Sequence, residues 1–370
     1  MIIGVLGGGQ LGRMLALAGY PMGFRFRFYD ESPDAPAGHL GDMIAAAWSD
    51  HRELDLFARG LGVATYEFEN VPAETVAHLA STVRVHPPVA ALETAQDRAS
   101  EKRLFERLGI PVPPWAAVSS EEELRIAIQG LGLPAVLKTR RLGYDGKGQC
   151  LIRHAREVSS AWQHIAGASA VVEAFVPFDR ELSIIGVRSR DGNTAFYPLV
   201  ENVHREGILR RSRAPAPNVS PELQRTAETY SAAALAALDY VGVLAIELFE
   251  QGGRLLANEM APRVHNSGHW TIEGAETSQF ENHLRAIVGL PLGSTAAVGQ
   301  SVMVNLIGEL PRLEEIVAVP GAHPHLYGKE PRPRRKVGHV TLHAADAKAL
   351  ASNLQKLLDV MPGAIEYAFE

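Results

Sequence analysis

The chain has 370 residues, 46% of them hydrophobic and 21% charged, with a formal net charge of −6 and a single cysteine, Cys150. This length and composition predict two or three globular domains, and the acidic balance argues against a nucleic-acid partner. One cysteine excludes an internal disulfide, so we expect a cytoplasmic protein. We find neither an amino-terminal secretion signal nor an apolar run of ~18 residues, and we therefore expect no membrane partner.

The amino-terminal segment carries a glycine-rich turn between a strand and a helix. Ile2–Leu6 is apolar, Gly7–Gly12 matches G-x-G-x-x-G, and a helical pattern then runs to Tyr20. With Asp30 closing the next predicted strand, Phe24–Tyr29, this outlines a dinucleotide-binding motif. The same turn can bind any phosphate at a helix amino terminus, or simply allow close packing. We favour a phosphate or substrate site over a nicotinamide dinucleotide site.

Strands and helices keep alternating up to residue 95, which predicts a mostly parallel, doubly wound sheet. The predicted elements are a helix at Arg52–Leu61, a strand at Val63–Phe68, a helix at Ala73–Ala80 and a strand at Thr82–Val85. Glu67, Glu69 and Asn70 lie at the end of the first of these strands, at the sheet edge where such folds bind ligands. We favour Glu69 as a substrate contact, and the alternative is a polar cap on the following helix.

A small α/β unit with a glycine-rich loop follows a predicted domain boundary near Ala95. Its predicted helices are Gln96–Leu108, Glu121–Gln129 and Glu157–Ala166, and its predicted strands are Leu133–Leu137 and Gln149–Arg153. Lys138 follows the first strand, and three glycines, Gly143, Gly146 and Gly148, lie in the loop after it. Glycines let backbone N–H groups approach a phosphate closely. The loop is not a P-loop, because G-x-x-x-x-G-K-[ST] is absent, and the alternative is an ordinary Gly/Asp turn.

The middle of the chain places polar residues at the ends of apolar strands. The predicted elements are strands at Ala170–Val176, Leu182–Arg188 and Thr194–Val203 and a helix at Pro221–Leu238. Glu173 lies in the first strand, Glu181 precedes the second, and His204 follows the third. The exposed backbone of an apolar run such as Ala174–Val176 can bind the edge of an adenine base.

The sharpest chemical prediction concerns a hairpin formed by Val241–Phe249 and Leu255–Met260. A three-residue loop centred on Gly253 would place Glu247 opposite Glu259. Like charges that face each other destabilise a sheet, and a divalent cation removes that cost. Mg²⁺ favours one or two carboxylates together with substrate phosphates. The sequence therefore predicts a magnesium site here, the alternative being two solvated glutamates.

Two further polar stretches follow the hairpin. The first is a loop of polar residues, and the second is a basic segment among prolines, which precedes a predicted strand (Val337–His343) and helix (Asp346–Val360). The loop holds Arg263, His265, Asn266, Ser267, Gly268 and His269, and the basic segment holds Lys329, Arg332, Arg334, Arg335 and Lys336. Stiff, concentrated cations suit a phosphate dianion, whereas the alternative is a solvated charge run.

Together these motifs resemble the ATP-grasp superfamily and, within it, the N5-carboxyaminoimidazole ribonucleotide synthetases of purine biosynthesis. The matching stretches are Gly9–Met14, Tyr66–Glu69, Thr139–Gln149, Asn202–Leu209, Asn258–Arg263 and Arg335–His339. Leu142 departs from the pattern, since some relatives have a second glycine there. The resemblance implies an α/β fold of three parts: an amino-terminal Rossmann-like domain with a doubly wound parallel sheet (1–95), a central ATP-grasp domain (96–290) with a small flap subdomain (about 115–168), and a small carboxyl-terminal α/β domain (291–370).

The resemblance also implies a reaction and a set of site residues. ATP and bicarbonate would give carboxyphosphate and ADP, and the carboxyl group would pass to the exocyclic amine of 5-aminoimidazole ribonucleotide. ATP would bind at Arg98, Lys138, Gly143, Tyr144, Asp145, Gly146, Lys147, Gly148, Glu173, Ala174, Phe175, Val176, Glu181, His204, Asn258 and Glu259, and Mg²⁺ at Glu247 and Glu259. Catalysis would involve Arg263, His265 and Asn266, and the second substrate would bind at Gln10, Leu11, Glu69, Lys329, Arg335 and Lys336. The family further implies a homodimer.

Three alternatives stay open at this point. Another ATP-grasp ligase, such as a formate-dependent ribonucleotide ligase, would share the ATP site and differ in its acceptor. A nicotinamide-dependent oxidoreductase depends only on Gly7–Gly12 and gives Glu247 and Glu259 no role. A non-catalytic binding protein would tolerate the loss of Lys138 or of either glutamate, yet all three are present.

Overall fold

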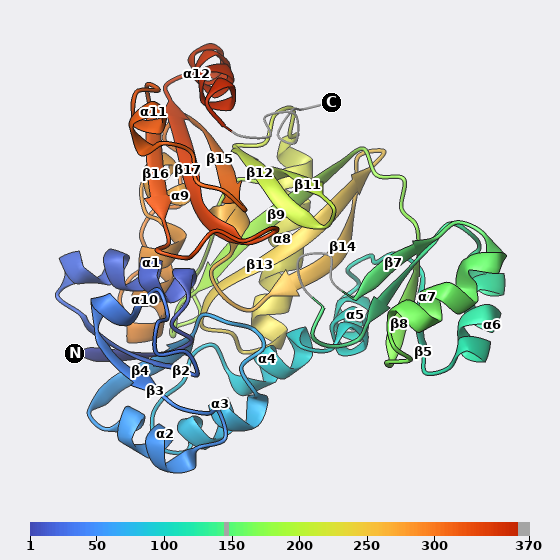
Figure 1. Cartoon of the computed structure of the whole chain (residues 1–370), viewed down its shortest axis with the longest axis horizontal. Coiled ribbons are helices and arrows are strands. Elements are labelled where there is room, and N and C mark those ends of the chain that lie inside the picture. The colour runs from blue at the N-terminus through green and yellow to red at the C-terminus, as the bar shows by residue number, and fades with distance from the viewer. Residues whose placement is uncertain (144–147, 362–370) are drawn as a thin grey trace.

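The computed structural model describes residues 1–143 and 148–361. The described strands form three sheets (Figure 1). The amino-terminal sheet has the order β3-β2-β1-β4 and is parallel throughout, which confirms the doubly wound pattern predicted from the sequence. Its elements are β1 (Ile2–Leu6), α1 (Gln10–Gly19), β2 (Arg25–Asp30), β3 (Asp42–Ala45), α2 (His51–Ala58), β4 (Leu61–Tyr66), α3 (Ala73–Ala80) and α4 (Val89–Ala95).

The predictions for this part need two corrections. The helix predicted to reach Leu61 ends at Ala58, because Gly60 takes a left-handed φ of 74° that an α-helix cannot continue. Thr82–Val85 is not a strand and contributes only one bridge, from Val85 to Ala64. Strand β3 and helix α4 were not predicted.

A smaller lobe stands apart from the rest, on the right of Figure 1. Its antiparallel sheet has the order β5-β8-β6-β7 and packs against two helices. The elements are β5 (Trp115–Val118), α6 (Glu121–Leu131), β6 (Ala135–Thr139), β7 (Gln149–Ile152), α7 (Val158–His164) and β8 (Ala170–Ala174). Leu142, after β6, has a left-handed φ of 61°, a conformation that suits glycine better than leucine. This explains physically why glycine fits that position in some relatives.

The largest sheet runs through the centre of the molecule in the order β14-β13-β9-β11-β12-β15-β17-β16, with β10 beside β9. Its strands are β9 (Arg180–Arg188), β10 (Thr194–Phe196), β11 (Val200–Arg205), β12 (Ile208–Ala214), β13 (Gly242–Gln251), β14 (Arg254–Ala261), β15 (Gln300–Ile307), β16 (Ala322–Leu326) and β17 (Lys336–Ala344). The helices around it are α5 (Arg98–Arg107), α8 (Pro221–Ala237), α9 (Thr271–Gly274), α10 (Gln279–Val288), α11 (Leu313–Val317) and α12 (Ala347–Asp359). The carboxyl-terminal unit shares this sheet, because β15 pairs with β12.

The strand predicted at Thr194–Val203 is in fact two strands, β10 and β11. Pro198 lies between them and has no N–H group to donate to a neighbouring strand. Glu181 was expected just before a strand but lies inside β9, opposite Asn202 of β11. Strands β15 and β16 were not predicted. No helix among residues 1–143 and 148–361 is both long and apolar enough to cross a membrane.

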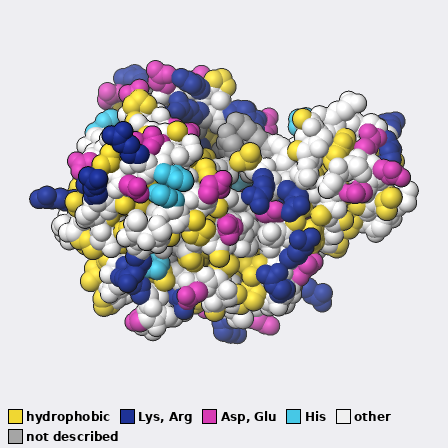
Figure 2. Space-filling view, turned by 90° about the horizontal axis from the view of Figure 1, so that it is seen from below, with side chains coloured by type: hydrophobic (Ala, Val, Ile, Leu, Met, Phe, Trp, Pro, Cys, Tyr) yellow, Lys and Arg dark blue, Asp and Glu magenta, His cyan; other side chains and the backbone are white. Residues whose placement is uncertain are grey.

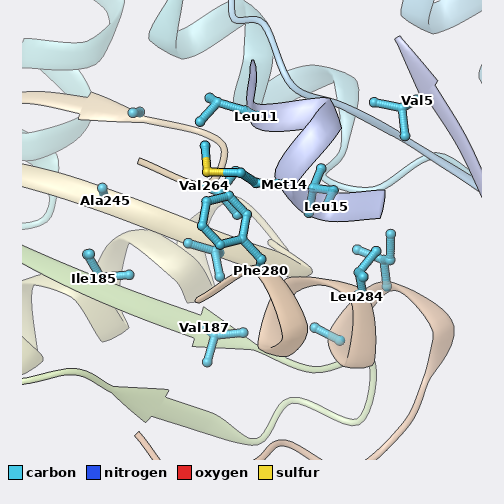
Figure 3. Close-up of a cluster of buried hydrophobic side chains, with 14 of the residues drawn as sticks. Val5, Leu11, Met14, Leu15, Ile185, Val187, Ala245, Val264, Phe280 and Leu284 are labelled. Atoms are coloured by element: carbon cyan, nitrogen blue, oxygen red, sulfur yellow. The ribbon is translucent and has the colours of Figure 1, made fainter. Parts of the chain in front are cut away.

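One apolar core joins the amino-terminal helix α1 to the central sheet (Figure 3). Leu11, Met14 and Leu15 of α1 pack with Phe280 and Leu284 of α10, and all five side chains are buried. Burying a side chain of this size contributes ~1.5–3 kcal/mol. This packing fixes the glycine-rich turn before α1 relative to strands β9 and β13.

Candidate functional site

A cavity of about 1080 Å³ lies where the amino-terminal unit, the smaller lobe, the central sheet and the carboxyl-terminal unit meet. Figure 2 shows Lys and Arg side chains gathered where the smaller lobe joins the main body. The predicted residues that line the cavity are Gln10, Leu11, Glu69, Arg98, Lys138, Gly143, Glu173, Ala174, Phe175, Val176, Glu181, His204, Glu247, Asn258, Glu259, Arg263, His265, Asn266, Lys329, Arg335 and Lys336. The fold therefore brings together residues from positions 10 to 336.

The flap residues are the exception. Tyr144, Asp145, Gly146 and Lys147 lie outside the described residues. Gly148 is described but does not line the cavity; a Cβ there would lie 2.6 Å from Thr139 Oγ1. Gly148 therefore allows close packing against strand β6.

The predicted facing of Glu247 and Glu259 is confirmed, although the predicted loop is wrong. The hairpin turn has two residues, Gly252 and Gly253, and both take left-handed φ angles. This turn alone would pair Glu247 with Asn258. A bulge at Asn258 shifts the register by one residue and brings Glu259 opposite Glu247. The carboxylate pair therefore depends on an irregularity that the hairpin pattern did not predict.

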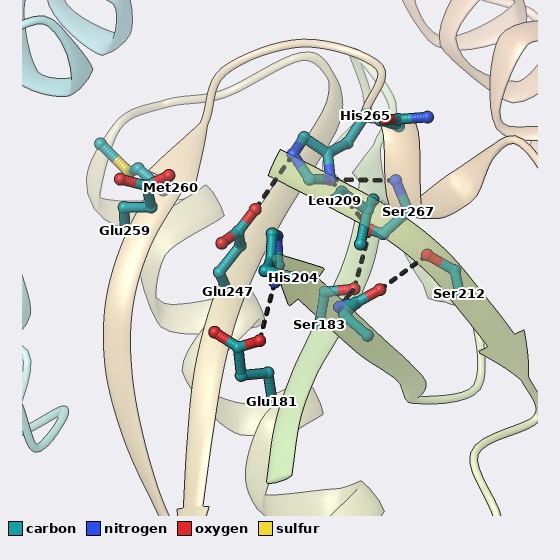
Figure 4. A network of polar contacts seen from close by, with 12 residues as sticks. Glu181, Ser183, His204, Leu209, Ser212, Glu247, Glu259, Met260, His265 and Ser267 are labelled. Atoms are coloured by element: carbon teal, nitrogen blue, oxygen red, sulfur yellow. Dashed lines mark hydrogen bonds and ion pairs between the residues drawn. The ribbon is translucent and has the colours of Figure 1, made fainter. Parts of the chain in front are cut away.

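Each carboxylate of the predicted metal site has a basic partner. Glu247 Oε1 lies 3.3 Å from Nε2 of His265 (Figure 4), and Glu259 Oε2 lies 2.6 Å from Nη1 of Arg98. Burial would raise the pKa of Glu247, but the hydrogen bond to His265 and the charge of His204 lower it to about 2. Glu247 is therefore ionised at neutral pH, as a cation ligand must be.

Two side chains of the polar loop after β14 are also paired. Arg263 Nη2 lies 2.7 Å from Glu69 Oε2. The Asn266 and Asn305 side chains exchange hydrogen bonds of 3.1 and 2.8 Å. Both pairs tie the polar loop after β14 to neighbouring elements, Glu69 belonging to the amino-terminal unit.

Lys138 lies in a buried ionic cluster that extends beyond the predicted residues. Its Nζ donates to Glu173 Oε2 at 3.2 Å and to Asn258 Oδ1 at 3.1 Å. Lys102 of α5 contacts the other Glu173 oxygen at 3.1 Å. Burial would raise the pKa of Glu173, but the charges of the two lysines hold it below its usual value. The Glu173 side chain is therefore paired with these two lysines. A base that binds beside strand β8 would contact the backbone there.

Helix α5 contributes a second group that we did not predict, Glu101. Its Oε1 accepts from the Met260 N–H at 2.5 Å. Burial and the charge of Glu259 raise the pKa of Glu101 to about 8. The spacing of Arg98, Glu101 and Lys102 places all three on one helix face. This spacing could have predicted that they share a site, but most residues of the helix are polar or charged, so the three did not stand out.

At the amino-terminal side of the cavity, the N–H groups of the glycine-rich turn before α1 already bind a side chain of the protein. The Glu67 carboxylate accepts from the N–H groups of Gly9, Leu11 and Gly12 at 2.9, 3.1 and 3.3 Å. Asp30 accepts from the Gly8 N–H at 2.7 Å. The prediction that these N–H groups bind a ligand phosphate is therefore wrong, and the dinucleotide alternative loses its structural basis.

The basic segment does meet this turn, as predicted. Lys329 Nζ donates to Gln10 Oε1. Arg335 is partly buried, lines the cavity and donates to the Glu330 carbonyl at 3.3 Å. The positive charge at this end of the cavity therefore comes from side chains rather than from the helix amino terminus.

Comparison with known proteins decides the family. Three family models match in order: the ribonucleotide synthetase preATP-grasp domain at residues 1–96, the ATP-grasp domain at 103–280, and the phosphoribosylaminoimidazole carboxylase carboxyl-terminal domain at 301–353. The N5-carboxyaminoimidazole ribonucleotide synthase of Pseudomonas aeruginosa is 54% identical over 96% of this chain and 98% of its own length. The chain belongs to the N5-carboxyaminoimidazole ribonucleotide synthase family.

Solved structures agree with this assignment. The N5-carboxyaminoimidazole ribonucleotide synthetase of Thermus thermophilus is 57% identical, with a TM-score of 0.94 over 97% of this chain and 98% of that one. A 31% identical synthase of Aspergillus clavatus, crystallised with ADP and 5-aminoimidazole ribonucleotide, has a TM-score of 0.91 over 97% and 98% of the two chains. The N5-carboxyaminoimidazole ribonucleotide synthase family therefore shares the ATP-grasp architecture described above.

One pH dependence follows from the site geometry. His204 Nδ1 lies 2.8 Å from Glu181 Oε2. Burial would lower the pKa of His204, but the hydrogen bond and charge of Glu181 raise it to about 9. A raised folded-state pKa gives stability that is fully present below the unfolded value of ~6.5 and is lost as the pH rises through 9.

Urea unfolding at pH 6.5 and pH 9 should therefore show a loss of about 3 kcal/mol in the wild type that His204→Gln does not show. Because His204→Gln keeps every other titrating group, the difference between the two proteins reports the titration of His204 alone. Equal losses in the two proteins would contradict the charged pair.

Proposed function

We propose that this chain, an ATP-dependent ligase, uses ATP and bicarbonate to carboxylate the exocyclic amine of 5-aminoimidazole ribonucleotide. The products are N5-carboxyaminoimidazole ribonucleotide, ADP and phosphate, within de novo purine biosynthesis. The observation that carries the proposal is a single cavity lined both by Lys138, Glu247 and Glu259 and by Gln10, Lys329 and Arg335. Such a cavity can hold a nucleoside triphosphate and a second phosphorylated substrate at once.

We assign the triphosphate to the end formed by β6, β8, β13 and β14. Lys138 and Arg98 supply positive charge for the phosphates, and the backbone of Ala174–Val176 borders the base. The Ala174 and Phe175 N–H groups already donate to the Pro114 and Pro134 carbonyls. A base at this edge would therefore depend on the remaining polar groups of the segment.

The donor set fits Mg²⁺ held together with nucleotide phosphates. Within the described part of the chain, no three His, Cys, Asp or Glu side chains form a group that could hold a metal alone. Two facing carboxylates that need further oxygens from a ligand are what Mg²⁺ accepts. Glu247 and Glu259 would hold it, and the ion would neutralise charge on the transferring phosphoryl group.

We assign the formation and use of carboxyphosphate to the part of the cavity beside the polar loop after β14. A bicarbonate oxygen attacks the γ-phosphorus, the bond to the ADP oxygen breaks, and carboxyphosphate forms. The ribonucleotide amine then attacks the carboxyl carbon, and phosphate leaves with the attacking oxygen of bicarbonate. We assign Arg263 and His265 to orient these anions, with Asn266 held beside them by Asn305.

We assign the ribonucleotide to the end formed by the glycine-rich turn and the basic segment. Lys329, Arg335 and Lys336 offer cations for its phosphate, and Gln10, Leu11 and Glu69 border the remainder. We further propose a homodimer, as the resemblance implies, and a cytoplasmic location, as the single cysteine suggests. The domain boundaries at residues 95 and 290 also remain our proposal.

A different ATP-grasp ligase with another acceptor is the main alternative, since it would use the same ATP residues. Release of ADP with and without 5-aminoimidazole ribonucleotide, at fixed ATP, Mg²⁺ and bicarbonate, separates the two. We expect the ribonucleotide to stimulate ADP release strongly and formate to have no effect in place of bicarbonate. Stimulation by another amine acceptor alone would assign the chain to a different reaction.

A further inference from the structure

The side chains behind Glu247 form a continuous hydrogen-bond chain across three strands (Figure 4). Ser212 of β12 donates to Asn202 Oδ1 at 2.7 Å, and Asn202 Nδ2 donates to Ser183 Oγ of β9 at 3.0 Å. Ser183 then donates to Ser267 Oγ at 2.7 Å, and Ser267 Oγ lies 2.9 Å from His265 Nδ1. All these side chains except His265 are buried. The chain therefore lies outside the cavity and reaches it only through the imidazole.

The direction of this chain is fixed at its imidazole end by a backbone group. The Ser267 N–H points at His265 Nδ1 at 3.3 Å, and an N–H group can only donate. Nδ1 is therefore an acceptor, and its single lone pair is shared between the Ser267 N–H and the Ser267 hydroxyl. The ring proton is then on Nε2, which faces Glu247 Oε1 at 3.3 Å.

Every hydroxyl in the chain can satisfy this direction. A serine hydroxyl has one hydrogen, so Ser267 can donate to His265 only if its oxygen accepts from Ser183. Ser183 can donate to Ser267 because its own oxygen accepts from the Asn202 amide. The strand register places Ser183 opposite Glu247 across β9 and β13.

We propose that Ser183, Asn202 and Ser267 are positioning residues that lock His265 in its Nε2–H tautomer and so aim a donor at the metal carboxylate Glu247. The opposite tautomer would bring two N–H donors together at Ser267 and turn a lone pair toward a carboxylate. With His265 holding one Glu247 oxygen, the other oxygen is left for the cation. Arg98 holds Glu259 on the facing strand in the same way. This inference depends on the ligand role proposed above for Glu247.

The test reads the tautomer directly by ¹⁵N NMR of the nucleotide-free protein labelled in its histidine rings. The signal of His265 is identified by its absence in His265→Gln. We expect an unprotonated Nδ1 and a protonated Nε2 in the wild type. A proton on Nδ1 of the wild-type ring, in either the neutral or the doubly protonated form, overturns the proposal without any need for a variant. The spectrum requires no substrate, so it also stands apart from the test of the proposed function.

The second arm measures Mg²⁺ dependence in Ser267→Ala and Ser183→Ala. Groups that hydrogen-bond a metal ligand change metal affinity by about 10–100-fold, and Ser267 acts through such a group, His265, so we expect the half-saturating Mg²⁺ concentration to rise about tenfold in Ser267→Ala. The matched control is Ser231→Ala, which removes the same atom from a fully buried serine whose hydroxyl has no hydrogen-bond partner among the described residues. A Ser267→Ala protein that keeps both the wild-type tautomer and the wild-type Mg²⁺ dependence would refute the lock.

Discussion

Replacing Glu247 or Glu259 with glutamine should reduce ADP formation about a thousandfold at ordinary Mg²⁺ concentrations. An amide keeps the shape of the carboxylate but removes the negative charge that would hold the proposed Mg²⁺ ion. A loss of ~4 kcal/mol of transition-state stabilisation, within the several kcal/mol that a metal ion supplies, corresponds to this factor. The measurement is steady-state ADP release at a series of Mg²⁺ concentrations.

The control for this pair is Glu250→Gln, on the same strand β13. Glu250 forms an ion pair with Arg180 at 2.5 Å and does not line the cavity. We expect its turnover to match the wild type, and all three variants to keep the wild-type circular dichroism spectrum. Full activity of either Glu247→Gln or Glu259→Gln would contradict the proposal that these two glutamates bind Mg²⁺.

Arg335→Ala should raise KM for 5-aminoimidazole ribonucleotide about a hundredfold and change KM for ATP by less than about threefold. A charge-assisted hydrogen bond from arginine to a phosphate contributes up to ~3 kcal/mol, which is the source of this estimate. Arg335 lines the cavity in the same basic segment as Lys329, which contacts Gln10, whereas we assign the ATP phosphates to Lys138. The two KM values should therefore change independently.

Arg332→Ala is the matched control, because it removes the same charge from the same segment. Arg332 is exposed, pairs with Glu330 at 3.0 Å and does not line the cavity. Its kinetic constants should stay at the wild-type values. If Arg335→Ala raised both KM values equally, misfolding would be the explanation, and an unchanged KM for the ribonucleotide would refute the phosphate site.

The sequence was most informative where a local pattern carries its own geometry. Alternating strands and helices predicted a parallel amino-terminal sheet, although not its strand β3, and the hairpin pattern predicted that Glu247 faces Glu259. The second prediction succeeded with the wrong turn, because the bulge at Asn258 replaced the residue expected in the loop. A bulge depends on contacts across the whole sheet and leaves little trace in a single strand.

The sequence was least informative where distant side chains satisfy one another. Glu67, just after strand β4 and more than fifty residues away along the chain, fills the glycine-rich turn, and a G-x-G-x-x-G pattern cannot show whether its N–H groups meet a ligand or a carboxylate. Lys102 is 1% exposed, although the sequence of its helix is typical of a solvated one, because its partner Glu173 lies on strand β8 of the smaller lobe. Such pairings come from tertiary packing, which no local period encodes.

The most direct test of the proposed reaction follows the oxygen of bicarbonate. With ¹⁸O-labelled bicarbonate, ATP, Mg²⁺ and 5-aminoimidazole ribonucleotide, the phosphate released should carry one ¹⁸O atom, because that oxygen joins carbon to phosphorus in carboxyphosphate and leaves with phosphorus. Mass spectrometry of the phosphate in the first turnovers gives the answer before the label exchanges with water. Phosphate without ¹⁸O, formed together with the carboxylated ribonucleotide, would contradict the carboxyphosphate route.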